Sequence, residues 1–399
     1  MKIIKGLLGI LLSLLLIAIG FGVGFVYYVF VEDAPVSETL KEDSEVPSGE
    51  TGIDDEVIKN GDLSIHFMEL GNIYTGDSIL IQCGDNDILI DAGSEYSSAP
   101  TLISYIDKYV TDNTLEYVIA THGHTDHIAS FISTEEYTGI FEHYKVENII
   151  DFPLTNSSGS SRTIVGRYRN ARDNEIAEGA NHWTALECYN EENGASRVIQ
   201  LSEDVNMEIL YSYYYENTSS SENNYSVCLM INQGDNHYLF TGDLETAGEK
   251  RLVTYYEENH GGLPHCVLYK AGHHGSKTSS CPELMEAITP EYVVVCCCAG
   301  TSEYTDENDN QFPTQEFIDN VAPYTKNVYV TTMVDNYTPK DEFESGTTVK
   351  SMNGNIVFTV TDGQIKLMFS NNNLRLLDTE WFKSCLLYTS PSPRDPKTS

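Results

Sequence analysis

The sequence predicts an α/β (α+β) fold, an αββα sandwich of two packed sheets, preceded by one transmembrane helix. Strand-like segments gather into two groups, at 63–152 and 206–369, and helix-like segments lie within each group. Two groups of strands that carry their own helices favour two packed sheets over one parallel sheet. The chain has 399 residues, of which 41% are hydrophobic, so it can bury a large core.

The first group holds short apolar runs that end in glycine or polar residues, the pattern of buried strands. In chain order they are LSIHFMEL, SILIQC, DILIDAG, YVIAT and VENIIDF. A helix is predicted over 98–112, where apolar residues share one face, and another over 127–139.

The second group repeats this alternation of strands and helices. Its strands are NMEILYSYYY, SVCLMINQ, HYLFTGD, HCVLYKAG, YVVVCCC, VYVTT, NIVFTV and QIKLMF, with helices over 245–259, 281–288 and 314–321. Cys296, Cys297 and Cys298 extend an apolar run, and the chain has no C-x-x-C pair. We therefore expect the cysteines to be core residues.

The first 31 residues differ from the rest of the chain. Residues 6–31 carry no charge, Lys2 and Lys5 precede them, and acidic residues follow. A helix of that length would reach roughly 39 Å, against about 30 Å for the apolar core of a bilayer. We expect an uncleaved, single-pass signal anchor that leaves the bulk of the chain outside the cytoplasm. The alternative is a cleaved signal peptide, for which the apolar run is long.

The segments that flank the predicted domain (61–370) are not expected to belong to it. Residues 32–60 are acidic and rich in Ser, Pro and Thr, which is typical of a disordered linker. At the other end, CLLYTSPSPRD resembles a translated sequencing adapter, so residues 385–399 are predicted to be an artefact and are left out of the fold prediction. Residues 371–384, between the predicted domain and this C-terminal segment, are left without a prediction.

The formal net charge of the chain is −37 at pH 7. Loose attraction to long polyanions such as duplex DNA requires a basic surface, which this composition excludes. A local positive patch is compatible with it, and four arginines lie close together in SRTIVGRYRNAR: Arg162, Arg167, Arg169 and Arg172. They either contact an anionic substrate or pair with local acids on a solvated helix.

Three histidines and an aspartate follow an apolar strand in THGHTDH, residues 121–127. Alternate residues of an extended segment point the same way, so His122 and His124 can share one cation. Asp126 and His127, after the turn, can bind a second one. Imidazole and carboxylate are ligands suited to Zn, Mn or Fe.

Two further strand ends carry residues of the same kind. HYLFTGDLE places Asp243 after a strand and a glycine turn, where one carboxylate could bridge two metals. AGHHGSKTSS places His273 and His274 at another strand end, and we expect both to be ligands or nearly so. Single acids and histidines at strand ends are common, but three such ends in this order are a specific signal.

These motifs, H-x-H-x-D-H, T-G-D and H-H-G-S, resemble those of the metallo-β-lactamase superfamily. Over 63–369 the chain is similar to the hydrolase domain of ComEC-type DNA-uptake proteins and their free-standing relatives. The resemblance implies two divalent metal ions, Zn or alternatively Mn. It also implies that Asp91, at the end of DILIDAG, orients the metal ligands through hydrogen bonds.

The chain departs from the family pattern in three places. GNIYTGD, residues 71–77, replaces the family's shorter G-Q-G-D. NQFPT replaces a family segment similar to N-x-x-x-H-P and has no histidine. The loop over 153–163 supplies no third histidine for the first metal, for which His143, His182 and His237 are the other candidates. Because the family's channel is not recognised here, transport is not expected.

Two metals with a hydroxide between them would hydrolyse esters, amides or phosphodiesters. Asp126 is expected to be catalytic as well as a ligand. Arg or Lys near such a site favours phosphate, so we expect Ser276, Lys277, Arg162 and Arg167 to contact the substrate. The prediction is a membrane-anchored, extracytoplasmic phosphodiesterase acting on nucleic acid or a wall polymer such as teichoic acid. No protein partner is deducible.

Two other functions remain open at this point. A carboxylic ester, lactone or β-lactam hydrolase would use the same metals with apolar walls around the substrate. A non-catalytic surface binding module would have lost the metals, although the complete H-x-H-x-D-H motif speaks against it.

Overall fold

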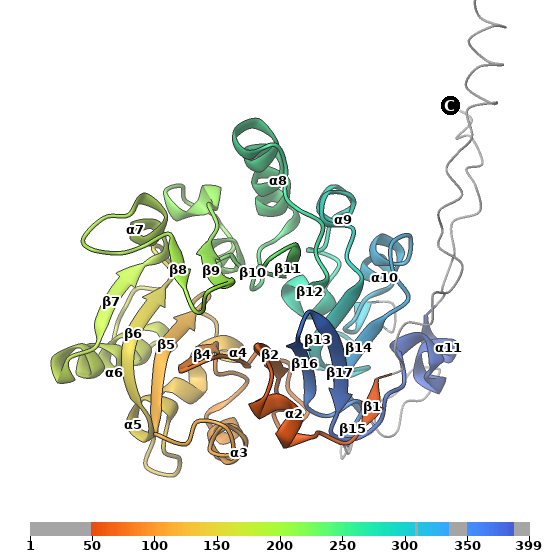
Figure 1. The fold of residues 1–399 in the computed structure, drawn as a ribbon, viewed down its shortest axis with the longest axis horizontal. Coiled ribbons are helices and arrows are strands. Elements are labelled where there is room, and N and C mark those ends of the chain that lie inside the picture. Colours follow the sequence, from red (N-terminus) through yellow and green to blue (C-terminus); the bar gives the residue numbers. More distant parts are fainter. Residues whose placement is uncertain (1–48, 308–309, 335–348, 387–399) are drawn as a thin grey trace, which may run out of the picture. The chain divides into compact units, whose positions relative to one another are not determined.

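The computed structural model describes residues 49–307, 310–334 and 349–386 (Figure 1). The predicted signal anchor and most of the predicted linker lie outside these ranges, as do residues 387–399. Within the described ranges, no helix combines the length and the apolar character needed to cross a bilayer.

The first sheet has nine strands among the described residues, and its central strands are buried on both faces. From β4 to β7 neighbouring strands are parallel, whereas β2, β3 and β4 are antiparallel to one another in turn. The carboxyl ends of β4, β5 and β6 therefore meet the beginning of β3 at one edge. In spatial order the strands are β1 (Glu50–Thr51), β17 (Gln364–Phe369), β16 (Ile356–Thr361), β2 (Leu63–Phe67), β3 (Ile79–Cys83), β4 (Asn86–Ile90), β5 (Thr114–Ala120), β6 (Lys145–Asp151) and β7 (Asn181–Thr184).

The second sheet has eight strands in the part of the chain that the structure describes. Strands β11 to β14 are parallel, so their carboxyl ends also share one edge. In spatial order the strands are β15 (Val349–Ser351), β14 (Val328–Val334), β13 (Tyr292–Ala299), β12 (Leu268–Lys270), β11 (Asn236–Phe240), β10 (Leu229–Gln233), β9 (Val205–Ile209) and β8 (Val198–Gln200).

The two sheets pack face to face, and helices cover their outer faces (Figure 1). Phe67 of the first sheet stacks on Phe240 of the second, with ring centroids 6.3 Å apart. In β13, Val294 faces this shared core, while its neighbour Val293 faces a second core under the helices. This alternation is the signature of a sheet covered on both sides and confirms the layered α/β prediction. The outer helices are α3 (Ala99–Ile106), α5 (Ile140–His143) and α6 (Ile164–Glu178) on the first sheet, and α8 (Thr246–His260), α9 (Pro282–Ile288) and α10 (Gln315–Val321) on the second. Helix α7 (Ala185–Asn190) contacts β6 and β7 of the first sheet and β9 of the second.

The end of the predicted linker belongs to the fold, so the prediction of disorder was wrong over 49–60. β1 pairs with β17, and helix α2 (Asp55–Lys59) follows it. Asp54 caps this helix by accepting hydrogen bonds from two backbone N–H groups, and Ile58 is buried against Val357 and Met368. The acidic composition of the segment predicted disorder, although Asp54 caps a helix there and Ile58 is a buried apolar residue.

The other end of the domain extends beyond residue 370. A short 3-10 helix, η7 (Leu376–Asp378), leads into helix α11 (Glu380–Cys385), and Trp381, Phe382 and Leu386 pack in the second core. The first two residues of the predicted adapter segment, Cys385 and Leu386, therefore lie within the described fold. All nine cysteines are free thiols, eight of them buried, as expected for core residues.

The helix predicted over 127–139 is broken into short pieces. Helix α4 (Thr125–Ile128) leads into η2 (Ala129–Phe131), and the chain is then non-helical up to α5. The Thr134 side chain accepts hydrogen bonds from the backbone N–H groups of Glu136 and Tyr137, which replaces helical pairing by a local turn. The apolar spacing alone did not reveal this competition.

Candidate metal centre

The candidate site lies at the edge where strand ends of both sheets converge. The histidine motif follows β5, and Asp91 follows β4 in the first sheet. Asp243 follows β11, and the histidine pair follows β12 in the second sheet. Because loops after parallel strands meet at one edge, segments far apart in the sequence are brought together there.

Asp243 is the centre of the site. Its Oδ2 atom lies 3.2 Å from His127 Nε2 and 3.3 Å from His274 Nε2. The same oxygen lies 3.8 Å from His273 Nε2 and 3.9 Å from His122 Nε2. One buried carboxylate oxygen therefore faces four imidazole nitrogens, an arrangement that suits a carboxylate shared between two cations.

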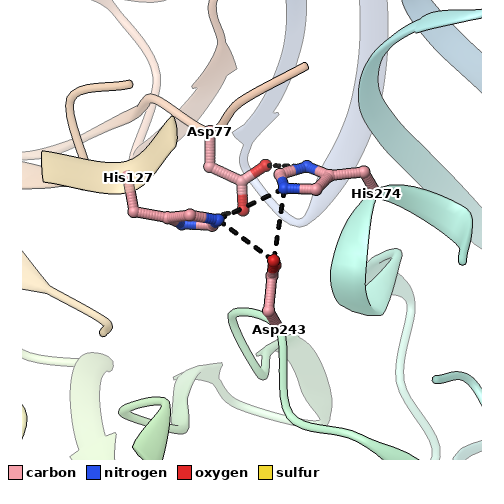
Figure 2. Close-up of side chains that lie close together, drawn as sticks. All are labelled: Asp77, His127, Asp243 and His274. Carbon is pink, nitrogen blue, oxygen red and sulfur yellow. Dashed lines mark hydrogen bonds and ion pairs between the residues drawn. The ribbon is translucent and has the colours of Figure 1, made fainter. Parts of the chain in front are cut away.

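The unpaired polar atoms of the site indicate that a cation belongs there. Both side-chain oxygens of Asp243 and Oδ1 of Asp77 are buried without a geometrically acceptable hydrogen bond among the described residues. A buried carboxylate without such partners is costly unless positive charge compensates it. Asp77, His127, Asp243 and His274 offer ligand atoms that all lie within 4.8 Å of one another (Figure 2). These donors fit a divalent transition metal ion.

Hydrogen bonds orient His127 so that Nε2 faces Asp243. His127 Nδ1 donates to Asp91 Oδ2 across 2.7 Å, which leaves Nε2 as the nitrogen that can bind a metal. Asp91 is itself held by the backbone N–H and the hydroxyl of Thr121, each at 2.7 Å. Asp91 thus lies where the sequence placed it, behind the ligands.

His274 is oriented in the same sense by the second sheet. Its Nδ1 lies 3.0 Å from the carbonyl oxygen of Cys296 in β13, and its Nε2 faces Asp243. The backbone at His273 and His274 is left-handed, with φ of 46° and 53°. Non-glycine residues in this region cost of order 1–3 kcal/mol each, and such strain is concentrated at functional sites. Here it turns both adjacent rings toward one carboxylate.

The remaining residues of the H-x-H-x-D-H motif lie next to this core. His122 Nε2 and His124 Nδ1 are 3.0 Å apart, so both nitrogens can reach one cation. Asp126 Oδ2 is 3.5 Å from His274 Nε2, and the Asp126 side chain is 18% exposed. Asp126 therefore combines contact with the centre and access to solvent. A Cβ on Gly93 would collide with the Asp126 carbonyl, so glycine is needed for this approach.

Opposite charges shape the titration of the buried groups. Burial lowers the pKa of His127, but the Asp243 and Asp91 carboxylates raise it well above its usual value. Burial raises the pKa of Asp243, but His127 and His274 hold it well below its usual range. Burial lowers the pKa of His122 well below its usual value, so this imidazole stays neutral and able to bind a metal.

The other histidine candidates for the first metal are engaged elsewhere. His143 pairs with Asp107 at 3.0 Å, His182 pairs with Asp151 at 2.9 Å, and His237 contacts Asn232 at 2.7 Å. The ring that approaches Asp243 beside the first motif is that of His273, whose Nδ1 is held by the Thr278 hydroxyl at 2.8 Å.

The residues expected to contact a substrate are spread over several places. Ser276 and Lys277 follow the histidine pair; Ser276 is buried, and Lys277 donates to the Asn310 side chain at 2.7 Å. Arg162 is exposed before α6. Arg167 donates to Tyr96 at 3.0 Å and lines a groove of about 630 Å³ with three glutamates, so it is not part of a broad basic surface.

Three residues that sequence reasoning did not assign to the site lie in or beside it. Asp77 and Lys270 are buried and form an ion pair within the centre. Asp77 ends the GNIYTGD segment, whose glycine–aspartate step was the available signal, whereas nothing in the sequence pointed Lys270 inward. Tyr304 is 56% exposed, and its hydroxyl lies 3.4 Å from Asp126 Oδ2.

An aromatic wall borders the centre on the side of Tyr304. The Tyr304 ring packs on Phe312 with centroids 5.1 Å apart. The Phe312 ring in turn lies 5.8 Å from that of His273 and 6.3 Å from that of His274. Phe312 belongs to the NQFPT segment that lacks the family's histidine, so an apolar ring stands next to the metal-binding imidazoles.

The fold and the site together define a metal-dependent hydrolase. Residues 71–133 match the family model of the metallo-beta-lactamase superfamily. The chain is 39% identical to competence protein ComA of Neisseria gonorrhoeae over 79 residues, which cover 20% of this chain and 11% of ComA. It is 24% identical to ComE operon protein 3 of Bacillus subtilis over 246 residues, or 57% of this chain and 28% of that protein.

Solved structures also resemble the chain at low similarity. The metallo-beta-lactamase fold protein YhfI from Bacillus subtilis aligns with a TM-score of 0.37 and 10% identity, over 67% of this chain and 95% of YhfI. Human tRNase Z, short form, aligns with a TM-score of 0.31 and 12% identity, over 67% of this chain and 91% of that enzyme. The matched segments of the two competence proteins are a small part of each, so their activities do not transfer as a whole.

Proposed function

We propose that this protein is a dinuclear metal-dependent phosphodiesterase whose catalytic domain lies outside the cytoplasm. The observation that carries the proposal is the position of Asp243 Oδ2, within 3.9 Å of nitrogens from four imidazoles. A carboxylate oxygen with ligands on two sides is what a pair of cations about 3.5–4 Å apart requires.

The ligands divide into two sets that share Asp243. Asp126, His127 and His274 would hold one cation, since their Oδ2 and Nε2 atoms converge within 3.2–3.5 Å of the His274 nitrogen. The other would be held by the remaining imidazoles, His122, His124 and His273. Zn or Mn bound there would polarise the scissile group and supply a water of lowered pKa.

The protein's own residues would guide the proton and the substrate. Asp126 can accept a proton from the attacking water through the carboxylate oxygen that is not assigned to the cation, because solvent reaches this side chain. Lys277, next to the histidine pair, places positive charge at the rim, where a phosphate oxygen would be stabilised. The Tyr304 hydroxyl can donate a hydrogen bond to Asp126 and so hold that carboxylate in place.

The resemblance to competence proteins supports a phosphodiester as the substrate. Nucleic acid and wall polymers such as teichoic acid both contain this bond. The net charge of −37 and the glutamate-lined groove beside Arg167 oppose binding of long duplex DNA. They favour a short, single-stranded or chain-end phosphodiester that reaches the centre without a broad basic surface.

Hydrolysis of a carboxylic ester, lactone or β-lactam is the second candidate. The aromatic wall of Tyr304 and Phe312 favours it, because an apolar surface beside the metal-binding histidines suits an acyl group better than a phosphate. The two candidates differ in the part of the substrate that must be bound, so one pair of assays separates them.

The experiment is carried out on the purified full-length chain in detergent. Metal content is measured by mass spectrometry, and hydrolysis of bis-(p-nitrophenyl) phosphate is compared with that of a p-nitrophenyl acyl ester. About two metal ions per chain with phosphodiester turnover would support the proposal. Turnover of the acyl ester alone would favour the second candidate function. Absence of both metal and turnover would indicate a non-catalytic binding module. Asp243→Asn serves as the inactive control.

The placement of the domain is part of the proposal and rests on the charge pattern of residues 1–31. Protease added to intact cells should remove the domain if it lies outside the membrane. Deletion of 1–31 should release a soluble, active protein, and persistent membrane association of this variant would refute the anchor.

A further inference from the structure

Lys270, the last residue of β12, is a fully buried cation inside the candidate metal centre. Only 1% of its side chain is exposed. Its Nζ forms an ion pair with Asp77 Oδ2, lies 3.7 Å from Asp243 Oδ1, and donates to the carbonyl of Gly242 at 3.3 Å. An ammonium group is costly to bury unless it is paired and hydrogen-bonded, so this position is maintained by specific partners.

Asp77 connects this ammonium group to a metal-binding histidine. One carboxylate oxygen, Oδ2, pairs with Lys270, while the other, Oδ1, lies 3.1 Å from His274 Nδ1. The carboxylate is therefore on the Nδ1 side of the ring, beside the Cys296 carbonyl, which lies 3.0 Å from the same nitrogen. Nε2, on the opposite side, faces Asp243 and Asp126 at 3.3 and 3.5 Å.

The same ammonium group distinguishes the two oxygens of Asp243. Oδ1 lies on the side of Lys270, and Oδ2 lies on the side of the imidazoles. A cation that bound Oδ1 would approach a fixed positive charge, which Coulomb repulsion disfavours in a buried site. Oδ2 is left as the oxygen that two cations can share.

We propose that Lys270 is a positioning residue that acts through Asp77 and Asp243 on the metal ligands. It holds Asp77 where this carboxylate, together with the Cys296 carbonyl, lies beside His274 Nδ1 and so leaves Nε2 to face the metals. It also disfavours a cation at Oδ1 of Asp243. This inference rests on the proposed function, because it concerns the same metals. It assigns Asp77 to orientation, although Asp77 is near enough to the other ligands to be one itself.

A double-mutant cycle tests this assignment on the full-length chain. Zn²⁺ affinity is measured by calorimetry for the wild type, Asp77→Asn, Lys270→Met and the double variant. Orienting partners of metal ligands typically change affinity by about 10–100-fold, and we expect each single variant to lose that much. The double variant should be no weaker than the weaker single variant. Lys250→Met, at an exposed lysine of α8 that pairs with Glu283, should bind as the wild type does.

Two outcomes of the cycle would overturn the proposal. If the two losses multiply in the double variant, Asp77 binds the metal independently of Lys270. If Lys270→Met binds Zn²⁺ normally, the ammonium group positions nothing. The absorption spectrum of bound Co²⁺ provides a second measure, because lost orientation of His274 would change the coordination geometry without unfolding, which circular dichroism monitors.

A measurement without metal keeps this inference separate from the proposed function. The ¹⁵N chemical shifts of His274 in the metal-free chain report which ring nitrogen carries the proton. Nδ1–H is expected in the wild type. In Asp77→Asn the share of the Nε2–H tautomer should rise, although the Cys296 carbonyl, 3.0 Å from Nδ1, is still present. This isosteric variant can be used even if Lys270→Met does not fold. Unchanged shifts would refute the positioning, whether or not the chain hydrolyses any substrate.

Discussion

Replacing Asp91 by asparagine should weaken metal binding without any change in the residues that contact the metal. In the wild type, His127 Nδ1 donates to Asp91 Oδ2 at 2.7 Å, and Thr121 donates two further hydrogen bonds of 2.7 Å. Asparagine keeps one acceptor oxygen and places an NH₂ group on the other side. If that NH₂ faces His127, the ring must accept at Nδ1 and carry its proton on Nε2, which blocks the metal.

The magnitude follows from these contacts. Loss of an orienting hydrogen bond to a metal-bound histidine costs about 10–100-fold in affinity, or roughly 1.4–2.8 kcal/mol. In the metal-free protein the cost is smaller, because the moved proton can bond to Asp243 Oδ2, 3.2 Å from Nε2. The variant should therefore fold and show its defect mainly on metal binding.

The assay is a calorimetric Zn²⁺ titration of Asp91→Asn beside Asp107→Asn. Asp107 is a matched control, because it also pairs with a histidine, His143, at 3.0 Å, but away from the centre. Wild-type affinity in Asp91→Asn, or an equal loss in both variants, would refute the argument that tautomer control at His127 supports the site.

Further predictions concern turnover, substrate choice and pH. Asp126→Asn should reduce kcat by at least about 100-fold with the fold retained, as loss of a general base does; normal turnover would exclude Asp126 from the reaction. Lys277→Ala should raise KM for phosphate esters more than for carboxyl esters, and equal effects would remove it from substrate recognition. Burial raises the pKa of Glu249 from 4.5 to about 7. The folded state thus retains a proton that the unfolded chain releases, so the free energy of unfolding should fall as pH rises from about 4.5 to 7. Glu249→Gln should flatten that slope in denaturant titrations, and an unchanged slope would assign it to other groups.

The layered fold was largely predictable because its strands are covered on both faces. Strands of this kind appear as short apolar runs, and nearly every predicted run is a strand at its position in the sequence, as YVVVCCC is in β13. NIVFTV and QIKLMF, predicted with the second group, form β16 and β17 of the first sheet instead. The errors fell where composition conceals local contacts. The segment 49–60 was predicted to be disordered, but Ile58 is buried against the first sheet. The helix predicted over 127–139 is interrupted by a turn at Thr134.

The candidate ligands were predictable from three motifs at strand ends, since strand ends that meet at one edge bring such residues together. His122, His124, Asp126, His127, Asp243, His273 and His274 all lie at the centre. The third imidazole beside His122 and His124 was not predicted, because the sequence offered His143, His182 and His237 for that role and placed His273 with His274. Only packing decided that His143, His182 and His237 pair elsewhere and that His273 faces Asp243.

By itself the sequence determined the kind of fold, the chemistry of the ligands and the strand ends that carry them, because apolar periodicity and residue type are local properties. The tertiary structure alone decided the geometry of the site. It determines which oxygen of Asp243 faces the imidazoles, and it brings Asp77 and Lys270 together as an ion pair. It also decided that Arg167 lies in a glutamate-lined groove. The pairing of Asp77 with Lys270 and the meeting of Asp243 with His127 each join segments more than a hundred residues apart. Such contacts arise only when the two sheets pack together.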